Sequence, residues 1–302
     1  MQYTFTFSIS VSYLTMKKYQ VILTCLFIFS FFSISAQNKP AYQLYTAKGK
    51  KVSYKKMLKK LQQADIVLFG ESHNNPISHW LQLEVAQSLY AKRKLTIGAE
   101  MFERDNQVAL TQYLTNEIDR KALDTLVRLW NNYPTDYEPL VEFAKSNYIP
   151  VIATNIPRKY ASLVFKKGLE ALELLANEEK EWIAPLPIEY DKELPGYKNM
   201  LTMMGDMHSG ENLPKAQAIK DATMAFSILE NFDKSKLFLH LHGSYHSDNY
   251  EGILWYLRKA SPDLKYLTIS TVSQEMIGKL TKEHLGKADY IICIPENMTK
   301  TY

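Results

Sequence analysis

Six apolar runs predict buried strands, and segments with helical spacing of apolar residues lie between them. The runs cover residues 65–69, 95–102, 149–153, 236–242, 265–271 and 289–294. Helical spacing occurs at 52–63, 77–89, 107–113, 121–130, 140–146, 160–176 and about 215–229. Because parallel strands need crossover helices, this alternation predicts an α/β fold with a mostly parallel central sheet flanked by helices. Residues from about 160 to 230 show no strand pattern and are expected to form a helical insertion, or cap, over the strand ends.

The N-terminus has the pattern of a secretory signal peptide. Residues 21–34 follow two lysines and are almost entirely apolar, and Ala36 offers a small residue for cleavage. This apolar run of about 14 residues is too short for a transmembrane helix, which needs about 20. We therefore expect a signal peptide at residues 1–36, with Met16 as the true start. Residues 37–302 are expected to form a single exported domain, in the periplasm or outside the cell.

Cysteine content and charge exclude several kinds of site. After residue 36 the chain contains one cysteine, Cys293, which excludes an internal disulfide and a thiolate metal cage. Cys25 lies inside the apolar run, and no lipid-anchor motif precedes a cysteine at the cleavage point. A lipid anchor is therefore not supported, whereas association with a membrane stays open. Removal of Lys17 and Lys18 lowers the formal charge from +4 to +2, which is too little to predict binding of nucleic acid.

Two of the predicted strands end in the same pattern, Gly-x-x-His. The first strand leads into Gly70 and His73, and the fourth, about 170 residues later, leads into Gly243 and His246. Glycine permits a sharp turn at the end of a strand, and histidine binds metals or transfers protons near neutral pH. Because the ligands of open α/β sheets bind where parallel strands end, the two motifs predict two sides of one site.

Polar residues follow four of the predicted strands and form the candidate chemical site. As metal ligands we expect His73, His246, His242 and Glu100, because imidazole and carboxylate groups are usual ligands of zinc, manganese, cobalt or iron. As catalytic groups of an enzyme we expect Glu71, Glu100, Glu103 and Arg104. The third strand is followed by Asn155 and Arg158. The alternative for each residue is a solvated or internally bonded side chain, and His240, deeper in its strand, is expected to be a core histidine.

The predicted helical insertion contains a different set of chemical groups. Five residues lie close together in it, near Tyr190 and Tyr197: Met200, Met203, Met204, Met207 and His208. Thioethers, an imidazole and phenols serve in haem pockets for packing and axial ligation. The alternative is that the methionines fill a gap in the hydrophobic core.

Four segments carry a recognisable set of motifs. They are Gly70-Glu71-Ser72-His73-Asn74-Asn75-Pro76, Gly98-x-Glu100-Met101-Phe102-Glu103-Arg104 with Gln107, Pro150-Val151-Ile152-Ala153-Thr154-Asn155-Ile156-Pro157-Arg158, and Ala216-Gln217-x-x-x-Asp221-Ala222-Thr223-Met224-Ala225. From about Asp65 to Glu296 the chain resembles the ChaN-like haem-binding uptake family of the Tiki superfamily. The wider superfamily includes Tiki and TraB proteins, is similar to erythromycin esterases, and has two Gly-x-x-His motifs with intervening glutamates. These correspond here to His73, His246, Glu100 and Glu103.

The resemblance implies an exported haem-binding protein that takes part in the uptake or handling of haem and iron. It implies an α/β sheet with a helical cap, haem as cofactor, a homodimer that shares haem, and outer-membrane uptake machinery as a partner. The expected haem contacts are Met204, Met207, His208, Tyr245, Arg158, Asn155, Gln217 and Asp221. The lipid-anchor cysteine that many members carry at the mature N-terminus is absent from this sequence.

A metal-dependent hydrolase, either a peptidase or an esterase, is the second hypothesis. His73, His246 and a glutamate would bind a divalent ion that activates water, and Glu100 or Glu71 would act as the general base. The paired Gly-x-x-His motifs favour this hypothesis, because the packing of haem does not require them. In a third hypothesis the histidines only stabilise the end of the sheet through hydrogen bonds.

Overall fold

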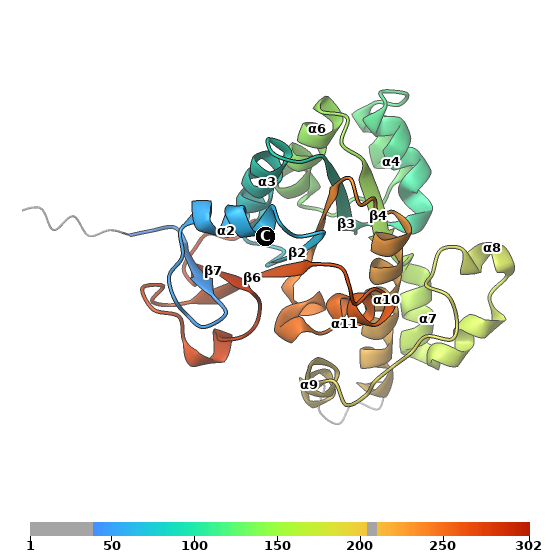
Figure 1. Ribbon diagram of the computed structural model, residues 1–302. Helices are drawn as coiled ribbons and strands as arrows, with labels where there is room; N and C mark the ends of the chain where they lie inside the picture. The colour runs from blue at the N-terminus through green and yellow to red at the C-terminus, as the bar shows by residue number, and fades with distance from the viewer. Residues whose placement is uncertain (1–38, 204–209) are drawn as a thin grey trace, which may run out of the picture. The chain divides into compact units, whose positions relative to one another are not determined.

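A seven-stranded sheet runs in the order β1-β7-β6-β2-β5-β3-β4 through the residues that the computed structural model describes, 39–203 and 210–302 (Figure 1). The strands are β1 (Gln43–Thr46), β2 (Ile66–Glu71), β3 (Leu95–Glu103), β4 (Val151–Asn155), β5 (Leu237–Gly243), β6 (Tyr266–Gln274) and β7 (Tyr290–Pro295). Every pair of neighbours is parallel except β1 and β7. The predicted α/β class with a mostly parallel sheet is therefore confirmed.

Helices connect these strands. The α-helices are α2 (Tyr54–Leu61), α3 (Pro76–Tyr90), α4 (Gln107–Leu114), α5 (Arg120–Leu126), α6 (Glu138–Ser146), α7 (Arg158–Lys167), α8 (Asn177–Lys180), α9 (Pro195–Met203), α10 (Leu213–Glu230) and α11 (Ile253–Ala260). Short turns of other helical types are η1 (Arg104–Asn106), η2 (Tyr133–Tyr137), η3 (Leu169–Leu174), η4 (Gly210–Asn212), η5 (Ser244–His246), η6 (Asp248–Tyr250) and η7 (Lys282–His284). None of the helices in the described part of the chain combines the length and apolar character that crossing a membrane requires.

Helices cover both faces of the sheet, and a hydrophobic core lies on each side. On one face α2 to α6 pack against the strands through buried side chains such as Leu61, Leu89 and Leu123. On the other face α10 and α11 contribute Met224 and Leu257, and α7 packs against the outer side of α10 (Figure 1). Strands buried on both faces need continuous apolar runs, which explains why these runs were visible in the sequence.

The two strands that carry the Gly-x-x-His motifs are neighbours at the centre of the sheet. In the parallel pairing of β2 with β5, Gly70 lies opposite His242 and Glu71 lies opposite Gly243. After β2 the chain crosses β5 to reach β3. After β5 it crosses β2 in the opposite direction to reach β6. When the connections that follow two adjacent parallel strands run in opposite directions, a crevice opens at the carboxyl ends of these strands. Open sheets bind their ligands in such a crevice.

Local chemistry explains where the sequence-based boundaries differ from the structure. The helix predicted at 160–176 is divided by Gly168, whose φ of +83° ends α7 in a conformation that side chains disfavour, and 3₁₀ turns follow. The helix predicted at 121–130 ends at Leu126. Strand β1 was not predicted, because four residues of mixed polarity give too short a signal. The predicted signal peptide at residues 1–36 lies outside the described residues.

Candidate functional site

The glycines of the two Gly-x-x-His motifs each make room for the other motif. A Cβ atom on Gly70 would lie 2.7 Å from the Cα atom of Ser244, within the second motif. A Cβ atom on Gly243 would lie 2.7 Å from Cε1 of His73, within the first motif. The absence of both side chains therefore allows the ends of β2 and β5 to approach closely, and it places His73 against the backbone of the neighbouring strand.

His73 forms a hydrogen-bonded pair with Glu71. Its Nδ1 atom donates to Oε1 of Glu71 at 2.8 Å. Glu71 is buried and also accepts hydrogen bonds from the Tyr137 hydroxyl at 2.6 Å and from Nε2 of Gln82 at 2.6 Å. Burial lowers the pKa of His73, but the bond to Glu71 and the nearby carboxylates outweigh it and raise the pKa overall. The pair is thus a buried carboxylate that orients an imidazole.

The imidazole of His73 is the accessible part of this pair. Its side chain is 39% exposed, whereas that of Glu71 is fully buried. Trp130 packs edge-on against the ring, with centroids 4.9 Å apart. The backbone carbonyl of His73 accepts hydrogen bonds from His79 at 3.0 Å and from Asn132 at 2.9 Å. No described residue hydrogen-bonds to Nε2, and this atom lies beside Gly243, on which a Cβ atom would be 2.8 Å away.

His246 lies between two buried carboxylates. Its Nε2 atom lies 3.1 Å from Oε1 of Glu100, and its Nδ1 atom lies 2.5 Å from Oδ1 of Asp221 on α10. The amide of Gln217, one turn earlier on α10, lies 2.8 Å from the same Nδ1 atom. The other carboxylate oxygen of Glu100 accepts a hydrogen bond from the backbone N–H of Gly243 at 2.7 Å.

In this second carboxylate–histidine group, formed by His246 with Glu100 and Asp221, opposite charges stabilise the ionised forms of His246 and Glu100. Burial lowers the pKa of His246, but the charges of Glu100 and Asp221 overcome it and raise the pKa to about 10. Burial raises the pKa of Glu100, but the positive charge of His246 holds it well below its usual range. For Asp221 burial prevails and the pKa is raised. His246 is therefore a buried imidazolium at neutral pH, and both of its ring nitrogens are occupied.

His240 and His242 belong to a separate buried chain of hydrogen bonds. His240 bonds Thr154 through Nε2 at 2.8 Å and His242 through Nδ1 at 3.0 Å, and Nε2 of His242 bonds Ser247 at 2.8 Å. Burial lowers the pKa of both histidines, that of His240 to about 3. Both are neutral with all ring nitrogens bonded, as expected for His240 as a core histidine. The metal-ligand role predicted for His242 stays a prediction.

Among the remaining strand-end residues, Asn155 contacts the backbone of Glu100, whereas Glu103 and Arg104 contact neighbours outside the two carboxylate–histidine groups. Glu103 forms an ion pair with Arg128. Arg104 donates to the Ser227 hydroxyl at 2.6 Å and to the carboxylate of Glu230 at 3.0 Å. A side-chain N–H of Asn155 donates to the backbone carbonyl of Glu100 at 3.1 Å, and Arg158, at the start of α7, is exposed. Glu103 and Arg104 therefore stabilise the outer part of this edge, and their predicted catalytic roles stay predictions.

Helix α9 is bonded to the second group and covers it. The Tyr197 hydroxyl donates to Asp221 at 2.9 Å, and the Tyr245 hydroxyl donates to the backbone carbonyl of Gly196 at 2.6 Å. The backbone N–H of Gly196 donates to Glu251 at 2.7 Å. Of the other predicted haem contacts, Met204, Met207 and His208 lie outside the described residues.

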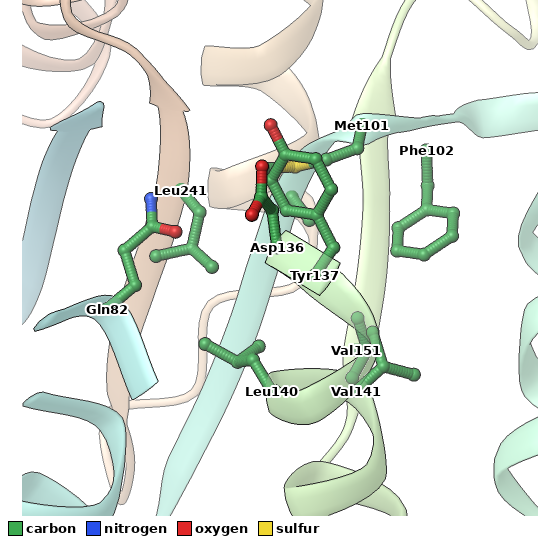
Figure 2. A pocket seen from close by; sticks show the side chains of 10 residues that line it. Gln82, Met101, Phe102, Asp136, Tyr137, Leu140, Val141, Val151 and Leu241 are labelled. Carbon is green, nitrogen blue, oxygen red and sulfur yellow. The ribbon is translucent and has the colours of Figure 1, made fainter. Parts of the chain in front are cut away.

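Sequence reasoning missed the groups that hold Glu71 in place. Gln82 is a polar residue at a buried position of α3, three residues before Val85, and this departure from the apolar pattern was a usable signal. Tyr137 lies in a π-type turn without periodicity, so nothing in the sequence marked it. Figure 2 shows both residues around a small internal cavity of about 10 Å³, among apolar side chains such as Leu140 and Leu241. A cavity of this size holds at most one water molecule.

The carboxylates of the site are engaged in hydrogen bonds with other groups of the protein. Each carboxylate in the two groups accepts hydrogen bonds from an imidazole and from a further donor: Glu71, Glu100 and Asp221. Among residues 39–203 and 210–302, no three His, Cys, Asp or Glu side chains are arranged to hold a metal ion. The geometry therefore gives no support to the metal-dependent alternative.

Comparisons with known proteins agree with this architecture. The chain is similar to the structure of ChaN of Campylobacter jejuni, described as binding haem cofacially, with a TM-score of 0.63 and 18% identity over 84% of this chain and 97% of that one. An erythromycin esterase is less similar, with a TM-score of 0.49 and 10% identity over 86% of this chain and 98% of that one.

Sequence comparison gives a distant relative and a family. The chloroplastic protein RETICULATA-RELATED 5 of Arabidopsis thaliana is 30% identical over 139 residues, which are 43% of this chain but only 19% of that protein. The family described as haem-binding uptake, Tiki superfamily, ChaN, matches residues 57–257. This match includes both Gly-x-x-His motifs and covers most of the sheet, so the predicted membership is confirmed. The chain belongs to the ChaN haem-binding uptake family of the Tiki superfamily.

Proposed function

We propose that this protein is an exported haem-binding protein that takes part in the uptake or handling of haem and iron. The observation that carries the proposal is the Glu71–His73 pair in a chain of the ChaN family. A carboxylate on Nδ1 fixes the orientation of an imidazole and increases the basicity of Nε2, and metal-ligating histidines usually have such a partner. Haem iron accepts an imidazole as an axial ligand.

Among the described histidines of the site, His73 fits an axial ligand of haem. Its ring is 39% exposed and no described residue bonds its Nε2 atom, whereas His240, His242 and His246 are buried with both nitrogens bonded. Trp130 packs edge-on beside His73 and adds an apolar surface for a flat aromatic ligand. We therefore assign the axial position to His73, and the bound iron would supply the redox and ligand chemistry of haem.

The same edge offers groups for the rest of the ligand. Arg158 is exposed at the start of α7 and forms no ion pair with any described residue, so its guanidinium suits a haem propionate. Asn155, at the end of β4, bonds the backbone carbonyl of Glu100 at the same sheet end. Met204, Met207 and His208, together with Tyr245, Gln217 and Asp221, remain proposed contacts of the cap.

A homodimer is proposed as the assembly. His73 would bind the iron, and a second chain would present its own haem against the first. The cofacial haem described for ChaN of Campylobacter jejuni supports this arrangement. Export by a signal peptide at residues 1–36 and transfer of haem to outer-membrane machinery complete the proposal.

Titration of residues 37–302 with hemin tests the function. We expect a Soret shift that saturates at a fixed ratio of hemin to protein. His73→Ala should weaken binding at least about tenfold. It should leave the fold intact, because Glu71 keeps its bonds from Tyr137 and Gln82. His284→Ala, at a histidine in contact with Ser273, is the matched control and should bind like the wild type.

The outcomes separate the function from the ligand assignment. A hemin spectrum unchanged by the wild-type protein would refute haem binding. Equal Soret shifts for the wild type and His73→Ala would refute only the role of His73. The unfolding midpoint of each variant, measured by circular dichroism, distinguishes loss of a ligand from loss of the fold.

A hydrolase without a metal is the second candidate. An imidazole held by a buried carboxylate, with its other nitrogen bonded to no described residue, is also the arrangement of a general base that activates water. The Glu71–His73 pair favours this candidate, whereas the family favours haem. A screen of nitrophenyl esters and peptides decides: turnover that is lost in His73→Ala supports a hydrolase, and absence of turnover in the wild type excludes one for these substrates.

A further inference from the structure

Seven lysines lie in α2 and in the segment that connects it with β1. They are Lys48, Lys50, Lys51, Lys55, Lys56, Lys59 and Lys60, and we name them the lysine strip. No aspartate or glutamate occurs between residues 37 and 64. The whole chain carries a formal charge of +4, so all residues outside the strip together carry −3. The positive charge of this protein is thus concentrated on one small part of its sequence.

The fold turns the whole strip towards solvent. All seven lysines are exposed, whereas Met57 and Leu61 on the opposite side of α2 are buried in the core. Within the described residues, none of the seven forms an ion pair with a carboxylate.

This arrangement is unfavourable for the isolated protein. Lys55 and Lys59, and likewise Lys56 and Lys60, are four residues apart on α2, where like charges repel by a few tenths of a kcal/mol. Lys55 and Lys56 lie in the first turn, where the helix dipole disfavours positive charge, and no acidic residue lies there, whereas Lys59 and Lys60 lie in the last turn, where the dipole favours it. Folding stability therefore does not account for the strip. An anionic surface would attract all seven lysines and so offset the repulsion between them.

We propose that the lysine strip docks the protein on a membrane of anionic phospholipids. Specific protein interfaces rely on tryptophan, tyrosine and arginine at their centre, but the strip has no arginine, and Tyr54 is half-buried with its hydroxyl bonded to Ser88. Lysines without a pocket or an aromatic anchor suit a fluid layer of phosphate groups, which requires only charge. We choose lipid over nucleic acid because the proposal rests on export, which would separate this protein from the nucleic acids inside the cell.

Vesicle sedimentation tests the proposal with residues 37–302. This form includes Ala41–Tyr302, which is a compact unit with its own cores. We expect it to sediment with phosphatidylcholine vesicles that contain roughly 30% phosphatidylglycerol, and not with phosphatidylcholine alone. Raising the salt from about 0.05 M to about 0.5 M should weaken binding at least about tenfold, because it shortens the range of electrostatic attraction.

Matched variants locate the surface. The quadruple variant Lys55→Gln, Lys56→Gln, Lys59→Gln and Lys60→Gln should lower the vesicle partition coefficient at least about tenfold. The control removes the same charge at exposed lysines elsewhere: Lys121→Gln, Lys166→Gln, Lys167→Gln and Lys234→Gln. It should stay within about twofold of the wild type. The strip variant should unfold at the same or a higher temperature, since its internal repulsion is relieved.

Three results would overturn the proposal. They are no binding of the wild type to anionic vesicles, equal losses in the strip and control variants, and binding of the strip to a DNA duplex in preference to vesicles. Both variants should retain the Soret shift with hemin. Failure of vesicle binding with an intact Soret shift would therefore refute the docking surface and leave the haem proposal standing.

Discussion

Replacement of Glu100 by glutamine removes one of the two charges that hold His246 ionised. Oε1 of Glu100 lies 3.1 Å from Nε2 of His246, and both side chains are at most 8% exposed. Glutamine has nearly the same shape and can still accept the N–H of Gly243, so the change removes charge more than packing. It leaves the imidazolium with Asp221 as its remaining anionic partner.

The pKa of His246 sets the size of the expected effect. A rise from 6.5 to about 10 corresponds to about 5 kcal/mol of stability. Because the folded pKa lies above the unfolded one, this stability is fully present below pH 6.5 and is lost as the pH rises towards 10. Between pH 7 and pH 9 the wild type should therefore lose about 2–3 kcal/mol through this group. Glu100→Gln should cost about 3 kcal/mol at pH 7 and flatten this slope, because a buried pair loses one partner.

Urea denaturation followed by circular dichroism at pH 7, 8 and 9 measures both quantities. Glu103→Gln is the matched control: Glu103 pairs with an exposed arginine, so its loss should change the unfolding free energy by less than about 1 kcal/mol at each pH. Equal pH slopes for the wild type and Glu100→Gln would refute the reasoning, since the imidazolium would then not depend on Glu100.

Two further substitutions test how the site is assembled. Gly243→Ala places a Cβ atom 2.7 Å from the ring of His73 and should displace that ring. Hemin affinity, measured by Soret titration, should therefore fall at least about tenfold. The circular dichroism spectrum should be retained. Unchanged affinity would mean that the position of His73 is immaterial to haem. Tyr197→Phe removes the hydroxyl that donates to buried Asp221. It should lower the unfolding free energy, measured by urea titration, by about 1–3 kcal/mol. A change of less than a few tenths of a kcal/mol would show that Asp221 does not need this hydrogen bond.

The fold followed from the sequence wherever burial determined the pattern. Strands β2 and β5 are buried on both faces, so their apolar runs were unambiguous. Strand β1 pairs only at the edge with β7 and gave no such signal. The division between α7 and η3 depends on the positive φ of Gly168, which a helical pattern alone does not reveal.

The location of the site could be predicted, but its pairing could not. The two Gly-x-x-His motifs indicated one shared end of the sheet, and β2 and β5 are indeed adjacent there. The partner of each histidine depends on strand register and on α10, which brings Asp221 to His246. The sequence therefore could not distinguish the roles of Glu71 and Glu100. In the structure Glu71 orients the half-exposed imidazole of His73, whereas Glu100 pairs with the buried imidazole of His246.

Crystallographic location of iron in the hemin complex tests the central proposal most directly. Anomalous scattering at the iron edge identifies the metal without reliance on the shape of the ligand. The account predicts an iron position within bonding distance of Nε2 of His73, with the opposite ring nitrogen still bonded to Glu71. Iron bound instead by a residue of the segment between α9 and α10, with His73 uncoordinated, would contradict it.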